Sequence, residues 1–251
     1  MTGKSAAQTR VLYLGTASYD KARNFDNQVG PFRDADGCAS VTHLKLTDLA
    51  ACPSKAALHR AVDASDVIAV SGGNTLFAMT RWRKLGLDAM LKRAMARGAV
   101  LCGGSAGAIC WFNGGHSDSR DPATLRRPNP NLSAKAKKNW DYIRVQCLGF
   151  VPGVLCCPHH DSTQSNGVPR ASSFDDMLRA ARPREVGIGI DNNAALVIDG
   201  KSYCVLSLDG NGGCVKKIVQ RGGGGGVTTI PLPMGKTLRP LAPLLEKNEK
   251  V

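Results

Sequence analysis

The chain is poor in aromatic residues and contains no long apolar run. Phe, Trp and Tyr make up 5% of the 251 residues, which leaves little surface on which nucleic-acid bases could stack. No segment reaches the roughly 18 consecutive apolar residues of a membrane span, so we expect no membrane partner. The opening MTGKSAAQTR also lacks the apolar core of a secretory signal. These absences predict a cytoplasmic protein without a nucleic-acid partner.

The cysteines form neither a disulfide framework nor a metal-binding pattern. There are nine of them, an odd number, and no C-x-x-C occurs. Disulfide frameworks belong mainly to short secreted chains, so we expect reduced thiols. The one local Cys/His cluster, at residues 156–160, has no second ligand pair with matching spacing. We therefore expect no metal and no other cofactor.

Positive charge is in excess. Lys and Arg number 33 against 20 Asp and Glu, a formal net charge of +13, which favours anionic partners without specifying a fold. Residues 120–138 carry six of the basic residues and three prolines. This stretch is predicted to be a solvated surface loop; the alternative is a contact with an anion or a nucleic acid, for which only Trp140 and Tyr142 could stack nearby.

Short apolar runs alternate with segments of helical periodicity. Strands are expected at 11–15, 41–46, 66–71, 99–102, 149–157 and 186–190, and helices at 55–64, 75–97 and 172–181. Strands that alternate with helices indicate a mostly parallel sheet. The predicted fold class is α/β, with helices on both faces of that sheet.

The pattern of apolar residues changes after residue 194. Short runs at 195–198, 203–208, 215–219 and 227–232 read as an antiparallel appendage of the same domain. The five glycines 222–226 suggest a flexible hairpin loop, and the ends (about 1–9 and 246–251) are expected to be frayed. We expect one domain over residues 1–251.

A candidate nucleophile follows the strand at 99–102. Gly103-Gly-Ser105-Ala-Gly107 matches G-x-S-x-G, in which small neighbours allow a serine to sit on a sharp strand-to-helix turn. The N–H of Ala106, at the start of the next helix, could then stabilise an oxyanion. The alternative is a turn in which Ser105 caps the helix or a phosphate binds.

A second glycine turn follows the strand at 66–71. Gly72 and Gly73 could bring a backbone N–H close to a ligand and supply the other oxyanion donor. Asn74 comes next and is a candidate for contact with the substrate. The alternative is an ordinary turn in which Asn74 or Thr75 caps the following helix.

Only five histidines could serve as the base. His43 and His59 lie in a strand pattern and a helix pattern, and His116 lies in a polar loop. His159 and His160 directly follow a strand, so they can face the same sheet edge as the serine. His159 is the preferred base.

The group that orients the base is left open between two neighbours. Asp191 and Asn192 follow the next strand; an acid is chemically preferable, and an amide can also hold a neutral imidazole. An ordinary turn built from Asx residues is the alternative. The order Ser, His, Asp/Asn differs from that of α/β-hydrolases, in which the histidine comes last.

Taken together, these motifs resemble one family. The segments 72–75, 104–108, 158–159 and 189–194 occur in the order found in the α-aspartyl dipeptidase (dipeptidase E) family of serine peptidases, and the likeness runs from about residue 11 to 208. The resemblance implies the class I glutamine amidotransferase-like fold. It also implies that Ser105 is the nucleophile and His159 the base, with the third member at 191 or 192. The family often has Glu or Asp at the position of Asn192, and the 120–138 insertion is longer than usual.

The resemblance further implies a cytosolic exopeptidase that hydrolyses dipeptides with an N-terminal aspartate. It places a substrate-reading arginine shortly after the histidine, which points to Arg170; a planar guanidinium suits a carboxylate. Two alternatives are a cyanophycinase-like hydrolase of β-aspartyl linkages and an inactive relative that binds an anionic partner. The sequence leaves open the exact peptide and the choice between monomer and homodimer.

Overall fold

The structure is a computed structural model that describes residues 2–208, 212–221 and 226–248. Contacts divide the chain into two compact units: unit 1 comprises Met1–Cys110 and Thr124–Pro128, and unit 2 comprises Trp111–Ala123 and Asn129–Val251. The single domain expected from the sequence stays a prediction. The glycine loop expected at 222–226 falls, except for Gly226, outside the described residues, as do the last three residues of the expected C-terminal fraying.

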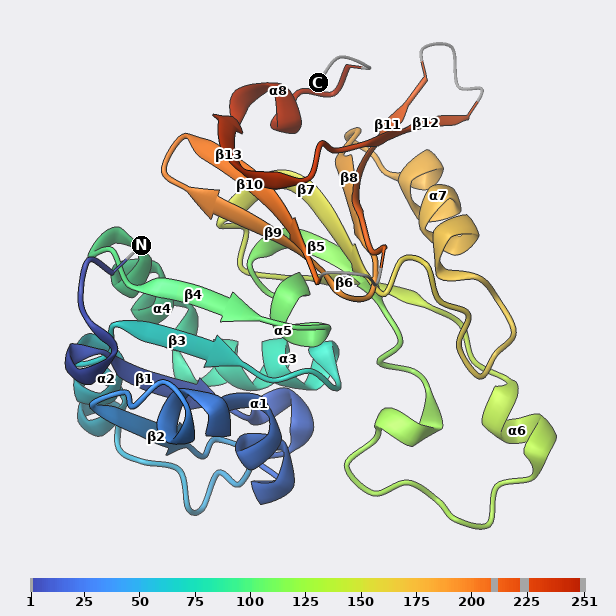
Figure 1. The fold of residues 1–251 in the computed structure, drawn as a ribbon. Helices are drawn as coiled ribbons and strands as arrows, with labels where there is room; N and C mark the ends of the chain where they lie inside the picture. Colours follow the sequence, from blue (N-terminus) through green and yellow to red (C-terminus); the bar gives the residue numbers. More distant parts are fainter. Residues whose placement is uncertain (1, 209–211, 222–225, 249–251) are drawn as a thin grey trace. The chain divides into compact units, whose positions relative to one another are not determined.

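Unit 1 contains a four-stranded parallel sheet in the order β2-β1-β3-β4 (Figure 1). The strands are β1 (Arg10–Leu14), β2 (Ser40–Leu44), β3 (Val67–Val70) and β4 (Val100–Gly103). Its helices are α1 (Ala22–Asp34), α2 (Lys55–Asp63), α3 (Thr75–Leu85), α4 (Leu87–Ala96) and α5 (Ala106–Ile109). The four predicted strands of this part and the helix predicted at 55–64 are confirmed, with shifts of a few residues at their ends.

Both faces of this sheet are covered. On one face Val11 and Tyr13 pack with Val29 of α1 and with the partly buried Phe25 and Phe32. On the other side lie α2, α3 and α4, of which α4 packs against both α2 and α3 (Figure 1). Burial on both faces explains why the two central strands, β1 and β3, are nearly continuous apolar runs, whereas the edge strand β2 alternates.

Two features of unit 1 differ from the sequence expectation. The single helix expected at 75–97 is two helices, because Gly86 adopts a left-handed conformation (φ 68°) that ends α3 and begins α4. Helix α1 was not predicted. Its apolar residues Phe25, Val29 and Phe32 do recur at helical spacing, but Gly30 and Pro31 lie inside it and weaken the pattern.

Unit 2 contains a six-stranded mixed sheet in the order β12-β11-β8-β7-β5-β6. Its strands are β5 (Phe112–Ser117), β6 (Ile143–Gln146), β7 (Val151–Pro158), β8 (Val186–Ile190), β11 (Val215–Gln220) and β12 (Val227–Pro231). The pairs β5–β7 and β7–β8 are parallel, and the remaining pairs are antiparallel. Helix α7 (Arg170–Ala180) buries Phe174 and Leu178 in a core cluster with residues of β7 and β11.

The other elements are short. A separate antiparallel sheet has the order β13-β10-β9, formed by β9 (Ala194–Asp199), β10 (Ser202–Ser207) and β13 (Gly235–Pro240). The remaining helices are η1 (Ala6–Gln8), η2 (Thr16–Ser18), η3 (Pro122–Thr124), α6 (Ala134–Lys138) and α8 (Ala242–Leu245). Within the described ranges, no helix has the length and apolar composition needed to cross a membrane.

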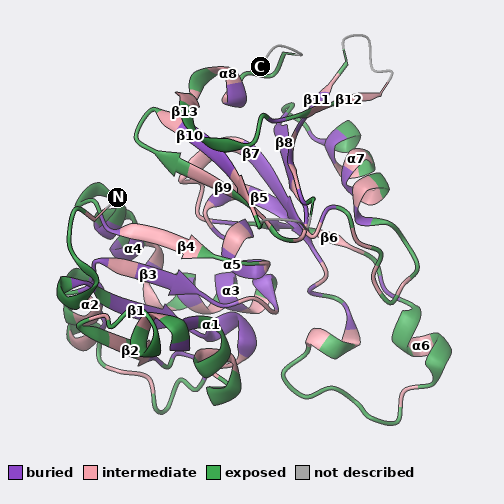
Figure 2. Ribbon diagram, in the orientation of Figure 1, coloured by how far each residue is buried: buried purple, intermediate pink, exposed green. Residues whose placement is uncertain are grey.

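The predicted fold class is confirmed: parallel strands are flanked by helices, and small antiparallel strands follow toward the C-terminus. Figure 2 shows the burial concentrated in the strands of each unit and in the helix faces turned toward them. In unit 1, β3 and β4 are neighbours, so their carboxyl ends lie side by side. In unit 2 the same holds for β7 and β8. The candidate site residues follow these four strand ends.

Candidate functional site

Ser105 sits on a strained turn between β4 and α5. Its backbone angles are φ 54° and ψ −119°, a region that residues with a side chain rarely adopt. Such strain costs on the order of 1–3 kcal/mol and persists where the surrounding structure enforces it, commonly at functional sites. The Ser105 side chain does not cap α5, so the alternative of a helix-capping serine does not hold.

The two outer glycines of the motif are required by the neighbouring strand. A Cβ atom at Gly103 would lie 2.5 Å from the carbonyl oxygen of Val70, and one at Gly107 would lie 2.2 Å from the same oxygen. Both distances are far below van der Waals contact. Strand β3 therefore passes so close to the turn that only glycine fits at positions 103 and 107.

The second glycine turn lies against this serine. A Cβ atom at Gly72 would be 3.2 Å from the Cβ of Ser105, so the α-carbon of Gly72 faces the serine side chain. Gly73 has φ 125° and packs on the carbonyl of Ala17, where a Cβ would be 2.2 Å from the oxygen. The N–H of Ala106, in the first turn of α5, has no intrahelical partner. Unit 1 thus brings Gly72 against the side chain of Ser105, and Ala106 follows Ser105 in the chain.

Asn74 has a structural role in unit 1. It is the N-cap of α3, and its Oδ1 accepts a hydrogen bond from the Phe77 N–H at 2.9 Å. Its Nδ2 donates to the Thr124 hydroxyl at 3.2 Å, and the residue is 4% exposed. Asn74 therefore caps α3, as the alternative expected, and its contact with the substrate stays a prediction.

In unit 2, His159 pairs with Asn192. His159 directly follows β7 in a left-handed conformation (φ 51°), and Asn192 follows β8, the parallel neighbour of β7. The Nδ1 of His159 lies 2.6 Å from the Oδ1 of Asn192. An amide oxygen can only accept, so in the neutral ring Nδ1 carries the proton and Nε2 is left as the acceptor. This is the tautomer that a general base requires.

Asp191 has a different partner. Both of its carboxylate oxygens lie 2.8 Å from the Nζ of Lys216 on β11, and Oδ2 accepts from Cys214. Burial raises the pKa of Asp191, but the hydrogen bonds from Cys214 and Lys216 outweigh that effect and hold it below its usual range. Of the two candidates left open by the sequence, Asn192 is the one in contact with His159, and Asp191 is committed to an ion pair.

The neighbouring histidines are buried. His160 is 5% exposed, and its Nδ1 lies 3.6 Å from Asp191; burial, followed by the charge of Lys216, lowers its pKa. His116 is fully buried, its Nε2 contacts the Ser173 hydroxyl, and its pKa falls to about 3, mainly through burial. The loop expected around His116 is in fact strand β5. Both histidines are core residues of unit 2.

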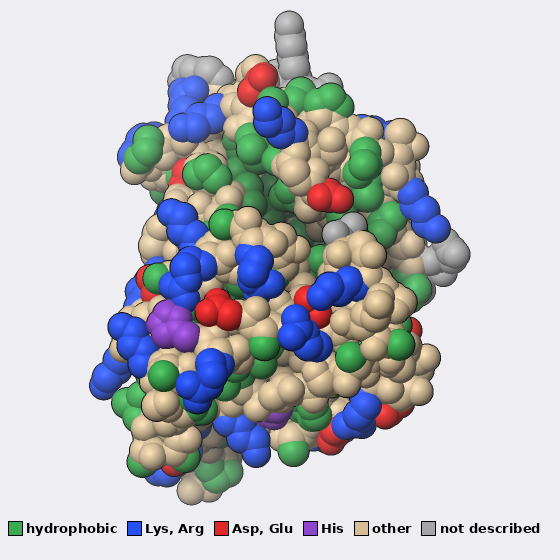
Figure 3. All heavy atoms as spheres, turned by 90° about the vertical axis from the view of Figure 1, so that its left-hand side faces the viewer, with side chains coloured by type: hydrophobic (Ala, Val, Ile, Leu, Met, Phe, Trp, Pro, Cys, Tyr) green, Lys and Arg blue, Asp and Glu red, His purple; other side chains and the backbone are tan. Residues whose placement is uncertain are grey.

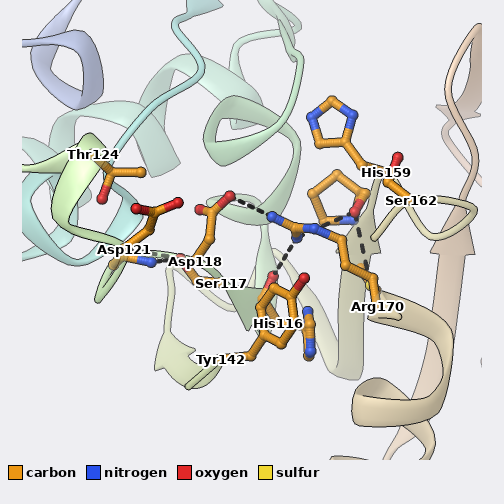
Figure 4. A network of polar contacts seen from close by, with 12 residues as sticks. His116, Ser117, Asp118, Asp121, Thr124, Tyr142, His159, Ser162 and Arg170 are labelled. Carbon is orange, nitrogen blue, oxygen red and sulfur yellow. Dashed lines mark hydrogen bonds and ion pairs between the residues drawn. The ribbon is translucent and has the colours of Figure 1, made fainter. Parts of the chain in front are cut away.

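Arg170 is also committed within unit 2. It is 1% exposed, and its guanidinium donates to the Asp118 carboxylate at 2.5 Å and to the Pro158 carbonyl at 3.3 Å. Figure 4 shows the guanidinium beside Asp118 and the Tyr142 ring, whose centroid is 5.1 Å from Cζ. A guanidinium with these partners is already neutralised, so the geometry favours a structural role over the expected role of reading the substrate.

This placement changes what we expect from replacing Arg170. Substitution by methionine removes the buried cation that pairs with Asp118, and breaking a buried pair in this way costs about 3 kcal/mol of unfolding free energy. We expect a clear loss of stability in urea titration and equal proportional losses of kcat/KM on Asp-Leu and Asn-Leu. A selective loss on Asp-Leu with unchanged stability would restore the direct reading role.

Sequence reasoning missed the partners of these residues. The contacts of Arg170 with Asp118 and of Asp191 with Lys216 join positions 52 and 25 residues apart. No local spacing indicates either pair. The Asp191–Lys216 pair could have been inferred only from the strand order, which places β11 beside β8.

The parts described above, a strained serine after one parallel strand and a histidine–amide pair after another, are those that serine peptidases use. Residues 1–206 match the sequence profile of peptidase family S51, and the chain belongs to that family. The family resemblance found from the motifs is thereby confirmed. The chain is a member of a family of serine peptidases.

Curated relatives match parts of longer proteins. The chain is 35% identical over 154 residues to the "Uncharacterized peptidase YgaJ" of Bacillus subtilis (strain 168), which covers 61% of this chain and 56% of that protein. It is 32% identical over 225 residues to a Trypanosoma brucei brucei protein named "G2/mitotic-specific cyclin-1", covering 81% and 65%. The chain therefore spans less than two thirds of either relative.

Solved structures share the fold. A peptidase from an acI-B1 Actinobacterium has a TM-score of 0.61 at 18% identity, covering 92% of this chain and 83% of that one. A putative peptidase E protein from Listeria monocytogenes EGD-e has a TM-score of 0.55 at 21% identity, covering 82% and 90%. At these identities the likeness supports the fold alone.

Proposed function

We propose that this chain is a serine exopeptidase that hydrolyses dipeptides with an N-terminal aspartate. Ser105 is the nucleophile, His159 the general base and Asn192 the residue that orients the base. The observation that carries the proposal is the 2.6 Å contact between His159 Nδ1 and Asn192 Oδ1, which leaves Nε2 ready to accept a proton.

The reaction proceeds through an acyl-enzyme. The Ser105 hydroxyl attacks the scissile carbonyl while His159 Nε2 takes its proton, and the oxyanion is stabilised by the N–H groups of Gly72 and Ala106. His159 then gives the proton to the leaving amino group. In the second half, His159 activates a water molecule that releases the N-terminal aspartate and restores Ser105. The chemistry uses no metal or cofactor.

The preference for aspartate comes from the family resemblance, and the charge of the protein supports it. The net charge is +13, and Figure 3 shows Lys and Arg side chains spread over one face, with Asp and Glu side chains among them. Exposed basic residues of α2 and α4 include Lys55, Arg60, Lys92 and Arg93. Such a field raises the encounter rate with acidic peptides and weakens as salt is added. The small acidic peptide is therefore the proposed partner.

A panel of peptides tests this function. Asp-Leu, β-Asp-Leu, Asn-Leu and Leu-Asp are incubated with the wild-type protein, and free leucine or aspartate is measured with and without EDTA. We expect kcat/KM on Asp-Leu to exceed that on Asn-Leu by about 10²-fold or more, because a site built for a carboxylate leaves charged groups unpaired with the amide. EDTA should change nothing.

The other outcomes are informative. Faster cleavage of β-Asp-Leu would move the assignment to a cyanophycinase-like β-aspartyl hydrolase. Cleavage of none of the four peptides, combined with salt-sensitive binding of an anionic polymer, would favour an inactive relative that binds an anionic partner. Loss of turnover in EDTA would contradict the serine mechanism.

A further inference from the structure

The side of Asn192 that faces away from His159 is held by Asp161. The Oδ1 of Asp161 accepts from the backbone N–H of Asn192 at 2.9 Å and from its side-chain Nδ2, also at 2.9 Å. The Ser162 hydroxyl lies 2.8 Å from the same Nδ2. Asp161 and Ser162 belong to the loop that follows His159. The loop after β7 therefore hydrogen-bonds Asn192, which follows β8. All four residues lie in unit 2.

We propose that Asp161 is a positioning residue for the base, acting on His159 through Asn192. This inference rests on the proposed function, since it concerns how the base of that reaction is prepared. The contact chain is His159 Nδ1, Asn192 Oδ1, Asn192 Nδ2 and Asp161 Oδ1. The Asp161 carboxylate thus binds the Asn192 amide on the side opposite His159.

The carboxylate fixes which way the amide points. A free asparagine can present either its oxygen or its nitrogen to an imidazole, and the two choices impose opposite tautomers. An ionised carboxylate can only accept hydrogen bonds, so the amide group facing Asp161 must be Nδ2. Oδ1 is then directed at His159, which must carry its proton on Nδ1. Asp161 in this way selects the bare Nε2 of the base.

The same arrangement makes the identity of residue 192 depend on residue 161. An aspartate at 192 would place a carboxylate oxygen where Nδ2 now lies, 2.9 Å from the Asp161 oxygen. Two carboxylates at this distance repel one another, so that one takes up a proton or swings away. From the sequence, an acid was the chemically preferable partner of the base; with Asp161 in place we expect Asn192→Asp to lower activity.

A double-mutant cycle tests the proposal. Asp161→Asn alone keeps an acceptor oxygen but loses the charge, and we expect kcat on Asp-Leu to fall about 5-fold with little change in KM. Asn192→Asp alone should lower kcat by about 10-fold or more. Asp161→Asn added to Asn192→Asp should raise kcat, because an amide then faces the new carboxylate.

The expected result is therefore a change of sign: one substitution harms the wild-type protein and helps the Asn192→Asp variant. A merely structural contribution of Asp161 would lower activity by the same factor in both backgrounds, and that result would overturn the proposal. Asp176→Asn is the matched control. It removes an exposed carboxylate of α7 in the same unit, and its kcat should be unchanged.

A second readout does not depend on turnover. In the full chain labelled with ¹⁵N-histidine, the His159 signal is identified by its absence from His159→Gln, and its neutral tautomer is read from the nitrogen shifts. We expect Nδ1–H in the wild type and a shift toward Nε2–H in Asp161→Ala. An unchanged tautomer in Asp161→Ala would overturn the proposal. If the wild type cleaves no peptide, the proposed function fails and the tautomer alone decides this inference.

Discussion

Replacing Ser105 by alanine lowers kcat on the best peptide by about 10³-fold or more, because the oxyanion donors and substrate binding alone retain only residual catalysis. The turn that holds the serine is built by its neighbours. Gly103 and Gly107 let β3 pass, and Gly72 faces the side chain. Loss of the hydroxyl should therefore leave the backbone unchanged. Steady-state release of leucine from Asp-Leu measures the effect.

A second substitution at the same position separates catalysis from strain. Ser105 has φ 54°, which alanine tolerates no better than serine, whereas glycine adopts it freely. Ser105→Gly should be as inactive as Ser105→Ala and have a higher melting temperature than that variant. If Ser105→Ala retains activity within about tenfold of the wild type, Ser105 is not the nucleophile.

Much of this arrangement was predictable from the sequence because it is local. The turns at residues 72–75 and 103–107 each follow an apolar run that ends in adjacent glycines, and both form as expected after β3 and β4. His159 likewise lies at the end of β7. A strand that ends in small or polar residues is recognisable from a few consecutive positions, so a single sequence is enough to predict it.

The remainder depends on contacts between distant segments. Arg170 looks like a free arginine at the start of a helix, and nothing near it in sequence shows that Asp118 and Tyr142 enclose it. The choice between Asp191 and Asn192 was open for the same reason. The choice depends on Lys216 of β11, the strand antiparallel to β8. Lys216 forms an ion pair with Asp191, and this leaves Asn192 as the partner of His159.

Strand β5 was not predicted from the sequence, for a further reason. Strand β5 has the sequence FNGGHS, in which glycines and polar residues hide any alternation, and it is nevertheless almost fully buried between β6 and β7. Glycine is required at Gly114, where a Cβ would lie 2.7 Å from the Val145 carbonyl oxygen. Tertiary packing overrides local propensity here, as it often does in sheets.

The second large effect on kcat is expected at His159, and its neighbour His160 provides the comparison. His159→Ala should reduce kcat on Asp-Leu to the level of Ser105→Ala, because the serine hydroxyl loses the group that takes its proton. His160→Ala should affect stability instead. Its ring packs against the α-carbon of Gly189 and lies near the Asp191–Lys216 pair, so its removal leaves a buried gap that lowers the melting temperature.

The double variant Ser105→Ala/His159→Ala decides whether the two residues form one catalytic unit. When two residues act in one catalytic unit, removing either one already abolishes their joint contribution. The double variant should therefore be no slower than either single variant. Independent contributions would instead multiply and lower kcat by about 10⁶-fold. Equal far-ultraviolet circular dichroism of all variants confirms that each is folded. If His160→Ala is the inactive protein and His159→Ala the active one, the base is His160, and the contact of His159 with Asn192 is only structural.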